Sequence, residues 1–423
     1  LSRGNRDHAR DIFASLLATD QAFLPARVNL ARIRLAEGDI DSARSLLDTA
    51  LSLEPESHRA MAERARLHLA ESEIDDALRW TERAVQASPA NLEYRELLVD
   101  IHLQRDDPVA AEDAARRAAA DNADNIEGGI LLGRTLARLG KPSQAGLTYT
   151  RLVRDADFNT GVLYRIARLQ AAIGAYDSAL YALGNALKGT PDHLPSRLMM
   201  VEMELALARH DIALEQANAL VADHPQDPRV HQLRGEAHLM LEDYTGAEKD
   251  FETARELDNS AEASLALLRT YRAAADEAQL ATVIDTYFAR GGNDPRLRAA
   301  EADLLIARRD WPAAAARLQS LIADYPDAAP ALNNAAYVLQ QLGDNTGALD
   351  YARRAQALAP DNPMVNDTLG WLLVESGEPA AGLGFLREAT ARAADNPELQ
   401  YHLAVALYRL QRTEEARMAL RKA

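Results

Sequence analysis

An alanine recurs every 34 residues along most of this chain, and this spacing constrains the fold more than any other feature. The regular part of the series contains Ala9, Ala43, Ala77, Ala111, Ala145, Ala179, Ala213 and Ala247. After an interval one residue short of two repeats, it resumes at Ala314 and continues through Ala348 and Gly382 to Ala416. A period of this length indicates a repeat protein in which each unit is one supersecondary motif.

Further columns accompany the alanine at fixed offsets. Small residues stand twelve positions before it at Ala31, Ala65, Gly133, Ala167, Gly235, Ala302, Ala336, Gly370 and Ala404. A glycine often precedes it by five, apolar residues follow it by four and seven, and a proline often follows it by twelve. These offsets predict a helix, a tight turn ending in glycine, a second helix stopped near proline, and small residues where the helices cross.

The stretch NNAAYVLQQLGDNTGALDYARRAQALAP, residues 333–360, closely resembles the tetratricopeptide repeat (TPR). The resemblance implies an all-α, right-handed α-solenoid, or superhelix, of about twelve 34-residue helix pairs after a leading half-repeat, with about 25 helices in all. We expect one solenoid over residues 1–423: a half-repeat at 1–20, regular repeats at 21–258, an irregular repeat at 259–294, and regular repeats at 295–423. The alanine-rich composition with only 5% aromatic residues is typical of such helices.

The ninth repeat, counting the leading half-repeat as the first, comprises residues 259–294 and departs from the pattern. No alanine occupies the repeated position unambiguously, and Gly291-Gly292 replaces the usual proline. One interpretation is a slightly deformed repeat with a loop deletion, and the other is a hinge. Asp294-Pro295 and Asp227-Pro228 each predict a helix N-cap followed by a first-turn proline.

Composition excludes several classes of function. The chain contains no cysteine, so it has no disulfide, thiolate metal site or cysteine nucleophile. Its net charge of −17 argues against coating nucleic acid, and no apolar run is long enough to span a membrane. No phosphate loop, nucleophile elbow or metal-ligand spacing is present. We therefore expect no enzymatic activity, no cofactor and no metal.

The remaining candidate is a binding groove. In the TPR family the first helix of each pair lines the groove, and the position eleven residues before the alanine faces inward. Among the residues at this position, the candidates for binding are Arg32, Arg66, Arg134, Arg168, Tyr337 and Trp371. Other first-helix residues complete the candidate set: Arg138, Arg165, Asn333, Asn334, Tyr401 and Tyr408. Carboxylates lie between the two sets at Glu202, Glu236 and Asp303.

Each set has an alternative interpretation. The arginines either bind an acidic partner or pair with carboxylates on neighbouring helices, which stabilises little. Tyr337 and Trp371 either pack internally or form a platform for a sugar face or an apolar peptide anchor. TPR proteins that hold chaperone C-termini resemble one another in a lysine and asparagine clamp, and the absence of lysine from these positions disfavours that use.

Residues 26–55 and 359–423 are similar to the TPR lipoprotein of the exosortase (PEP-CTERM) system. That resemblance implies a lipid-anchored periplasmic protein associated with exopolysaccharide production and envelope protein sorting, with the anchor outside this chain. Periplasmic TPR regions of polysaccharide secretion proteins are the near alternative. Since the sequence begins with Leu1, we expect a fragment of a longer precursor.

Two functions follow as hypotheses. The first is a non-enzymatic scaffold that holds a protein or peptide of an envelope machine in its groove. The second is direct binding of a polysaccharide by the C-terminal aromatic residues. The location in the periplasm depends on the resemblance, and the residues themselves do not distinguish it from the cytoplasm.

Overall fold

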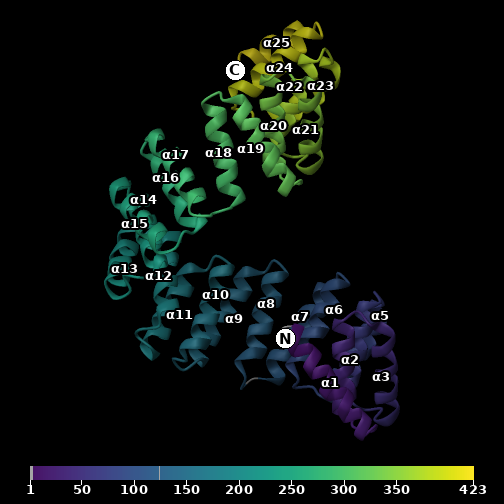
Figure 1. The fold of residues 1–423 in the computed structure, drawn as a ribbon. Coiled ribbons are helices and arrows are strands. Elements are labelled where there is room, and N and C mark those ends of the chain that lie inside the picture. Colours follow the sequence, from purple (N-terminus) through teal and green to yellow (C-terminus); the bar gives the residue numbers. More distant parts are fainter. Residues whose placement is uncertain (1–2, 123) are drawn as a thin grey trace. The chain divides into compact units, whose positions relative to one another are not determined.

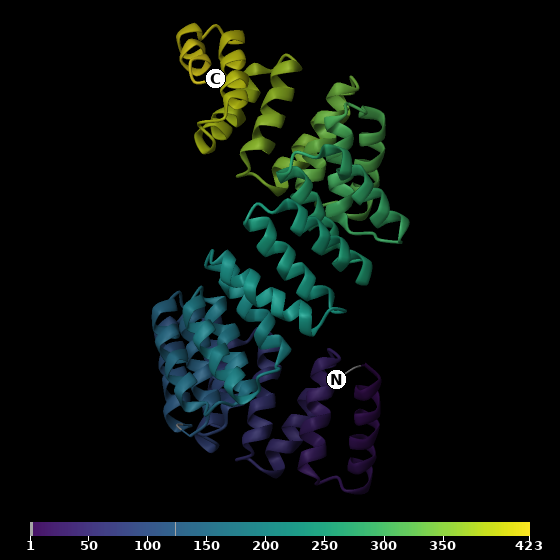
Figure 2. The ribbon, with the colours of Figure 1, turned by 90° about the vertical axis from the view of Figure 1, so that its left-hand side faces the viewer.

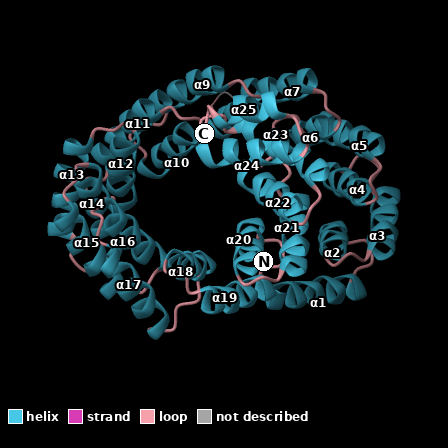
Figure 3. Ribbon diagram, turned by 90° about the horizontal axis from the view of Figure 1, so that it is seen from above, coloured by secondary structure: helices cyan, strands magenta, loops and turns pink. Residues whose placement is uncertain are grey.

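The computed structural model describes residues 3–122 and 124–423, and within these it contains 25 α-helices and no strand (Figures 1 and 3). The predictions of an all-α fold and of about 25 helices are confirmed. The chain divides into two compact units, Leu1–Ile212 and Ala213–Ala423. None of the helices in the described residues is both long and apolar enough to cross a membrane.

Unit 1 begins with a lone helix, α1 (Arg3–Thr19), which is followed by antiparallel helix pairs. The first helices are α2 (Leu24–Ala36), α4 (His58–Ala70), α6 (Leu92–Gln104), α8 (Ile126–Arg138), α10 (Thr160–Ala172) and α12 (Leu194–Ala206). The second helices are α3 (Ile40–Leu53), α5 (Ile74–Ala87), α7 (Pro108–Asp121), α9 (Pro142–Asp155) and α11 (Tyr176–Gly189). Within this unit the labelled first helices lie along one side and the second helices along the other (Figure 3).

Unit 2 repeats this arrangement, and α13 (His210–Asp223) contains the boundary between the units. The first helices are α14 (Pro228–Met240), α16 (Ala261–Ala273), α18 (Pro295–Ala307), α20 (Ala329–Gln341), α22 (Pro363–Glu375) and α24 (Pro397–Arg409). The second helices are α15 (Tyr244–Leu257), α17 (Glu277–Ala289), α19 (Trp311–Asp324), α21 (Asn345–Leu358), α23 (Pro379–Arg392) and α25 (Thr413–Leu420). Figure 2 shows the pairs of this unit stacked from teal to yellow.

The repeated alanines pack where the two helices of a pair cross, and from Ala43 to Ala348 each of them is 0% exposed. The residue twelve positions before each alanine and the residue four positions after it face each other at the crossing, and their sizes are complementary. A Cβ atom on Gly133 would lie 2.2 Å from the ring of Tyr149, and one on Gly235 would lie 2.7 Å from Phe251. Where the first residue is alanine, its partner is smaller than an aromatic ring, as with Leu183 opposite Ala167 and Thr81 opposite Ala65. The backbones therefore approach as closely as the larger partner allows.

The turn inside each pair needs a residue in the left-handed region, five positions before the alanine. Glycine fills it at Gly38, Gly140, Gly174, Gly343 and Gly377, with φ between 69° and 87°. Non-glycine residues occupy the same position in other pairs, including Glu242, Arg309 and Gln411 with φ of 60°, 58° and 61°. The predicted N-caps are also present, since the carboxylates of Asp227 and Asp294 accept hydrogen bonds from the backbone N–H groups of Arg229 and Arg296.

The same turn establishes the register of the irregular pair α16 and α17, which the sequence left open. Ala275 has a φ of 55°, so Leu280, five residues later, occupies the alanine position. Leu280 is 7% exposed and the crossing residues Leu268 and Ile284 are 3% and 2% exposed, so this crossing contains three large side chains. The missing residue lies in the loop between α15 and α16, which is shortened to residues 258–260. This supports a deformed repeat with a loop deletion.

Candidate binding surfaces on the first helices

Ion pairs connect neighbouring first helices in unit 1. They are Arg134–Glu96 at 3.0 Å, Arg138–Asp100 at 2.5 Å, and Arg165–Glu127. In each pair the arginine follows its carboxylate by 38 residues, which is one repeat plus one helical turn. All these side chains are about half exposed, so each pair contributes roughly 0–1 kcal/mol to stability.

Arg32 and Arg66 share two carboxylates. Arg32 Nε donates to Glu63 at 2.6 Å, and Arg66 donates to Glu63 and Glu93, each at 2.6 Å. Glu63 is 0% exposed, and a buried carboxylate requires such partners to offset its lost hydration. Five of the six predicted arginines are therefore paired, as the ion-pairing alternative expects. Arg168 is exposed and forms no ion pair with any residue in the described part of the chain.

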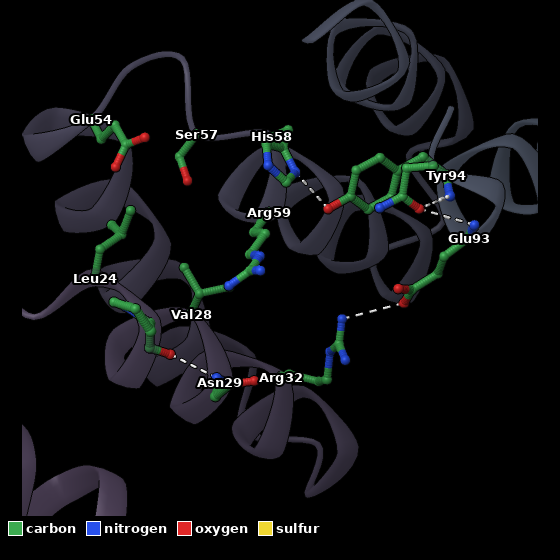
Figure 4. A pocket seen from close by; sticks show the side chains of 12 residues that line it. Leu24, Val28, Asn29, Arg32, Glu54, Ser57, His58, Arg59, Glu93 and Tyr94 are labelled. Atoms are coloured by element: carbon green, nitrogen blue, oxygen red, sulfur yellow. Dashed lines mark hydrogen bonds and ion pairs between the residues drawn. The ribbon is translucent and has the colours of Figure 1, made fainter. Parts of the chain in front are cut away.

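A pocket of about 540 Å³ lies among the first helices at the start of unit 1 (Figure 4). Its lining comes from α2, from the first turns of α4 and α6, and from the loops that precede α4 and α6. The lining residues are Leu24, Pro25, Val28, Asn29, Arg32, Glu54, Ser57, His58, Arg59, Asn91, Glu93 and Tyr94. The pocket thus combines an aliphatic wall on α2 with charged and hydrogen-bonding groups on α4 and α6.

Arg59 extends into this pocket (Figure 4), and sequence reasoning missed it. Among the described residues no carboxylate pairs with its guanidinium. Beside it, His58 Nδ1 and the Tyr94 hydroxyl lie 2.8 Å apart in a hydrogen bond, and burial together with Glu93 raises the pKa of Tyr94. A sequence signal existed, because Arg59 precedes Arg66 by seven residues and therefore lies on the same helical face.

The aromatic residues of unit 2 are only partly brought together. The ring of Trp371 on α22 stacks on His402 of α24 at 4.2 Å, and the ring of Tyr401 lies 6.5 Å from Trp371. Tyr337 instead contacts Trp311 edge to face at 5.9 Å. Tyr337, Tyr401 and Tyr408 are 42%, 49% and 69% exposed, whereas Trp371 is half-buried. Sequence reasoning missed His402 and Trp311, both of which orient predicted aromatics.

The predicted asparagines lie on α20, and both are half-buried. The Asn334 amide donates to the Asp303 carboxylate on α18 at 2.9 Å. Desolvation raises the pKa of Asp303, although Arg272 and this hydrogen bond oppose the shift. Asn334 therefore continues the series of contacts between neighbouring first helices, and Asn333 lies beside it on the same helix.

One group of potential metal ligands lies in the turn between α4 and α5. His68, Glu71 and Glu73 come close enough to share an ion. Arg44 pairs with Glu71, however, and Arg64 Nε donates to His68 Nε2 at 3.2 Å. Since Arg44 neutralises Glu71 and the hydrogen bond from Arg64 occupies the His68 Nε2 atom, we interpret this group as part of an ion-pair and hydrogen-bond cluster.

These observations define an all-α repeat protein whose first helices present exposed side chains on one face. The family model described as tetratricopeptide repeat matches residues 28–91, 130–193, 299–363 and 368–423, and a second model of the same description matches residues 170–237. The matched segments cover more than half of the chain. The chain belongs to the tetratricopeptide repeat family.

Solved TPR structures resemble the chain at low identity. The APC/C hetero-tetramer Cut9–Hcn1 matches at 14% identity, covering 99% of this chain and 90% of that one, with a TM-score of 0.44. Yeast Tom70 matches at 12% identity, covering 94% of this chain and 96% of that one, with a TM-score of 0.43. A comparison with curated protein sequences finds no match.

Proposed function

We propose that the protein is a non-enzymatic scaffold that binds a protein or peptide partner along the exposed face of its first helices. The observation that carries this proposal is the exposure of Tyr337, Tyr401 and Tyr408 on α20 and α24. Only 5% of the residues are aromatic, and large rings held on rigid helices form anchors at little cost in conformational entropy.

The partner we propose belongs to a bacterial envelope machine for exopolysaccharide production or for sorting of PEP-CTERM proteins. This part of the proposal is supported by the similarity of residues 26–55 and 359–423 to the exosortase-associated lipoprotein. We further propose that the protein lies in the periplasm and is attached to the membrane through a lipid anchor outside the chain. The periplasmic TPR region of a polysaccharide secretion protein remains the related alternative.

The test compares partner capture from periplasmic extract by matched tyrosine variants. Tyr337→Ala and Tyr401→Ala remove exposed rings from first helices, and Tyr181→Ala removes a ring that is 59% exposed on second helix α11. We expect the first two to reduce capture at least about tenfold, the effect of a typical hot-spot residue, and the third to leave it unchanged. Equal capture by all three variants, with unchanged helical circular dichroism, would contradict the proposal.

Direct glycan binding is the second candidate function. It is favoured by Tyr401 and Tyr408, which lie seven residues apart on α24 and are both exposed, an arrangement suited to contact with successive sugar faces. Titration with a soluble exopolysaccharide fragment should quench the fluorescence of Trp371, which lies beside Tyr401. A flat response up to millimolar sugar in a variant whose other tryptophans are replaced by phenylalanine would remove this candidate.

A further inference from the structure

We infer that the pocket among α2, α4 and α6 binds an extended peptide segment through one acidic side chain, which pairs with Arg59, and an adjacent aliphatic side chain. The inference rests on the proposed scaffold function and specifies the partner chemistry of a site far along the chain from the aromatic residues. A free charge, an apolar wall and the dimensions of the pocket support this inference.

Arg59 is the cation available to a ligand. The other arginine in the lining, Arg32, already binds Glu63 at 2.6 Å and lies 3.3 Å from Glu93. Glu93 is further neutralised by Arg66 at 2.6 Å. Among the described residues Arg59 has no such partner, and its guanidinium points into the pocket (Figure 4). A guanidinium offers a planar set of donors that fits a carboxylate in bidentate geometry.

The apolar wall determines what lies next to that carboxylate. Leu24 and Val28 form one side of the pocket at the start of α2 (Figure 4), and Pro25 of the same helix also lines it. Burial of an aliphatic side chain against this wall adds a hydrophobic contribution to the ion pair. It also excludes water from Arg59, which strengthens the ion pair.

A single acidic residue fits better than a cluster of acids. Glu54 also lines the pocket, on the loop between α3 and α4, and forms no ion pair within the described residues. A second negative charge on the ligand would meet this carboxylate without a free arginine to offset it. The pocket therefore favours an internal acidic residue over an acidic chain terminus, which would bring two carboxylates together.

The width of the pocket matches an extended chain. Its residues come from three consecutive first helices, and packed helices lie about 8–10 Å apart. The three helices span roughly 20 Å, which about six residues in extended conformation cover at roughly 3.3 Å each. The hydroxyl of Tyr94 and the side chain of Asn29 supply hydrogen-bonding groups within this span.

The test uses three heptapeptides that carry an N-terminal fluorescein and a C-terminal amide. Their sequences are Gly-Ala-Leu-Asp-Leu-Ala-Gly and the same peptide with asparagine or lysine in place of aspartate. Fluorescence anisotropy with the complete chain should show that the aspartate peptide binds roughly tenfold more tightly than the asparagine peptide, as expected for a charge-assisted bidentate pair. This preference should shrink as salt is added.

Variants of the protein assign the preference to Arg59. Arg59→Gln should abolish the difference between the two peptides, and Arg59→Glu should make the lysine peptide the tightest binder. Arg151→Gln is the matched control, because Arg151 on second helix α9 is also exposed and forms no ion pair within the described residues, but lies outside the pocket. Since Arg59 is exposed, its variants should keep the circular dichroism spectrum and the thermal midpoint of the parent protein.

Several outcomes would overturn the inference. These are equal binding of the aspartate and asparagine peptides, an unchanged preference in Arg59→Gln, and no binding of any peptide at millimolar concentration. Binding of only a free-acid version of the aspartate peptide would also overturn it, in favour of recognition of a chain terminus. If the inference fails while Tyr401→Ala still reduces partner capture, the scaffold function stands and only the pocket's ligand is wrong.

Discussion

The size complementarity at the helix crossings makes a quantitative prediction at Gly133. A Cβ atom at this position would lie 2.2 Å from Cε1 and 2.7 Å from Cζ of Tyr149, whereas carbon atoms in ordinary contact are about 3.5–4.0 Å apart. Tyr149 is 1% exposed, so its ring has no free space to move into. Gly133→Ala should therefore force the two helices apart.

The expected magnitude follows from two opposing effects. Overpacking of a tight core costs about 1–3 kcal/mol, and replacing a helical glycine by alanine recovers up to about 1 kcal/mol. We expect a net destabilisation of about 1–2 kcal/mol. Tyr149→Leu alone should cost about 2 kcal/mol or more because it leaves a cavity beside the glycine. The double variant should be more stable than the sum of the two single effects, since the next pair already combines Ala167 with Leu183 at the same positions.

Hydrogen exchange of the α8 and α9 amides is the appropriate assay, because long repeat arrays do not unfold in a single cooperative step. Gly184→Ala is the matched control, since Gly184 lies in α11 and a Cβ there meets no atom within 4 Å. It should stabilise its helix by about 0.5–1 kcal/mol. Unchanged protection in Gly133→Ala, or strictly additive effects in the double variant, would refute the reasoning.

Three further predictions concern the same framework. Burial raises the pKa of the Tyr149 hydroxyl to about 12. The stability contributed by the neutral buried tyrosine is therefore complete below the ordinary tyrosine pKa of about 10 and is lost as the pH rises through about 12. In alkaline denaturation curves, Tyr149→Phe should lose less stability over this pH range than the parent protein. The double variant Arg134→Gln, Arg138→Gln should lower the free energy of unfolding by less than about 2 kcal/mol at low salt, and the loss should be smaller still at high salt. A loss that added salt does not reduce would contradict solvent-exposed pairing. Arg309→Gly should raise the thermal midpoint, because Arg309 has a φ of 58°, a left-handed conformation that favours glycine. Gly343→Ala should lower the thermal midpoint, because Gly343 has a φ of 83°. Shifts of the opposite sign would show that the turn is not strained.

The sequence predicted the elements of the fold because the fold depends on local spacing. Ala43 and its equivalents, the small residues twelve positions earlier and the glycines of the turns are each required by contacts within one helix pair, so their period alone reveals them. The register of the irregular pair α16 and α17 could not be predicted in this way, because Leu280 occupies the alanine position and only the left-handed conformation of Ala275 reveals it.

The candidate site was harder to predict because it depends on contacts between repeats. The sequence pattern selected Arg134 and Arg165 but did not identify their partners, which lie one repeat and one turn earlier. A search for opposite charges 38 residues apart would have found them. Arg59 escaped because none of the positions considered lies in the first turn of α4, although the first turns of α4 and α6 line the pocket.

Site-specific photocrosslinking tests most directly whether partners bind the first-helix face. Benzophenone-bearing phenylalanine would replace Tyr401 or Tyr408 on α24 and, as the control, Tyr181 on α11, all of which are at least 49% exposed. The proposed function predicts that, in cells, crosslinks to a discrete protein partner form from the two α24 positions and not from Tyr181. Crosslinks from Tyr181 alone, or none from either α24 position, would contradict it.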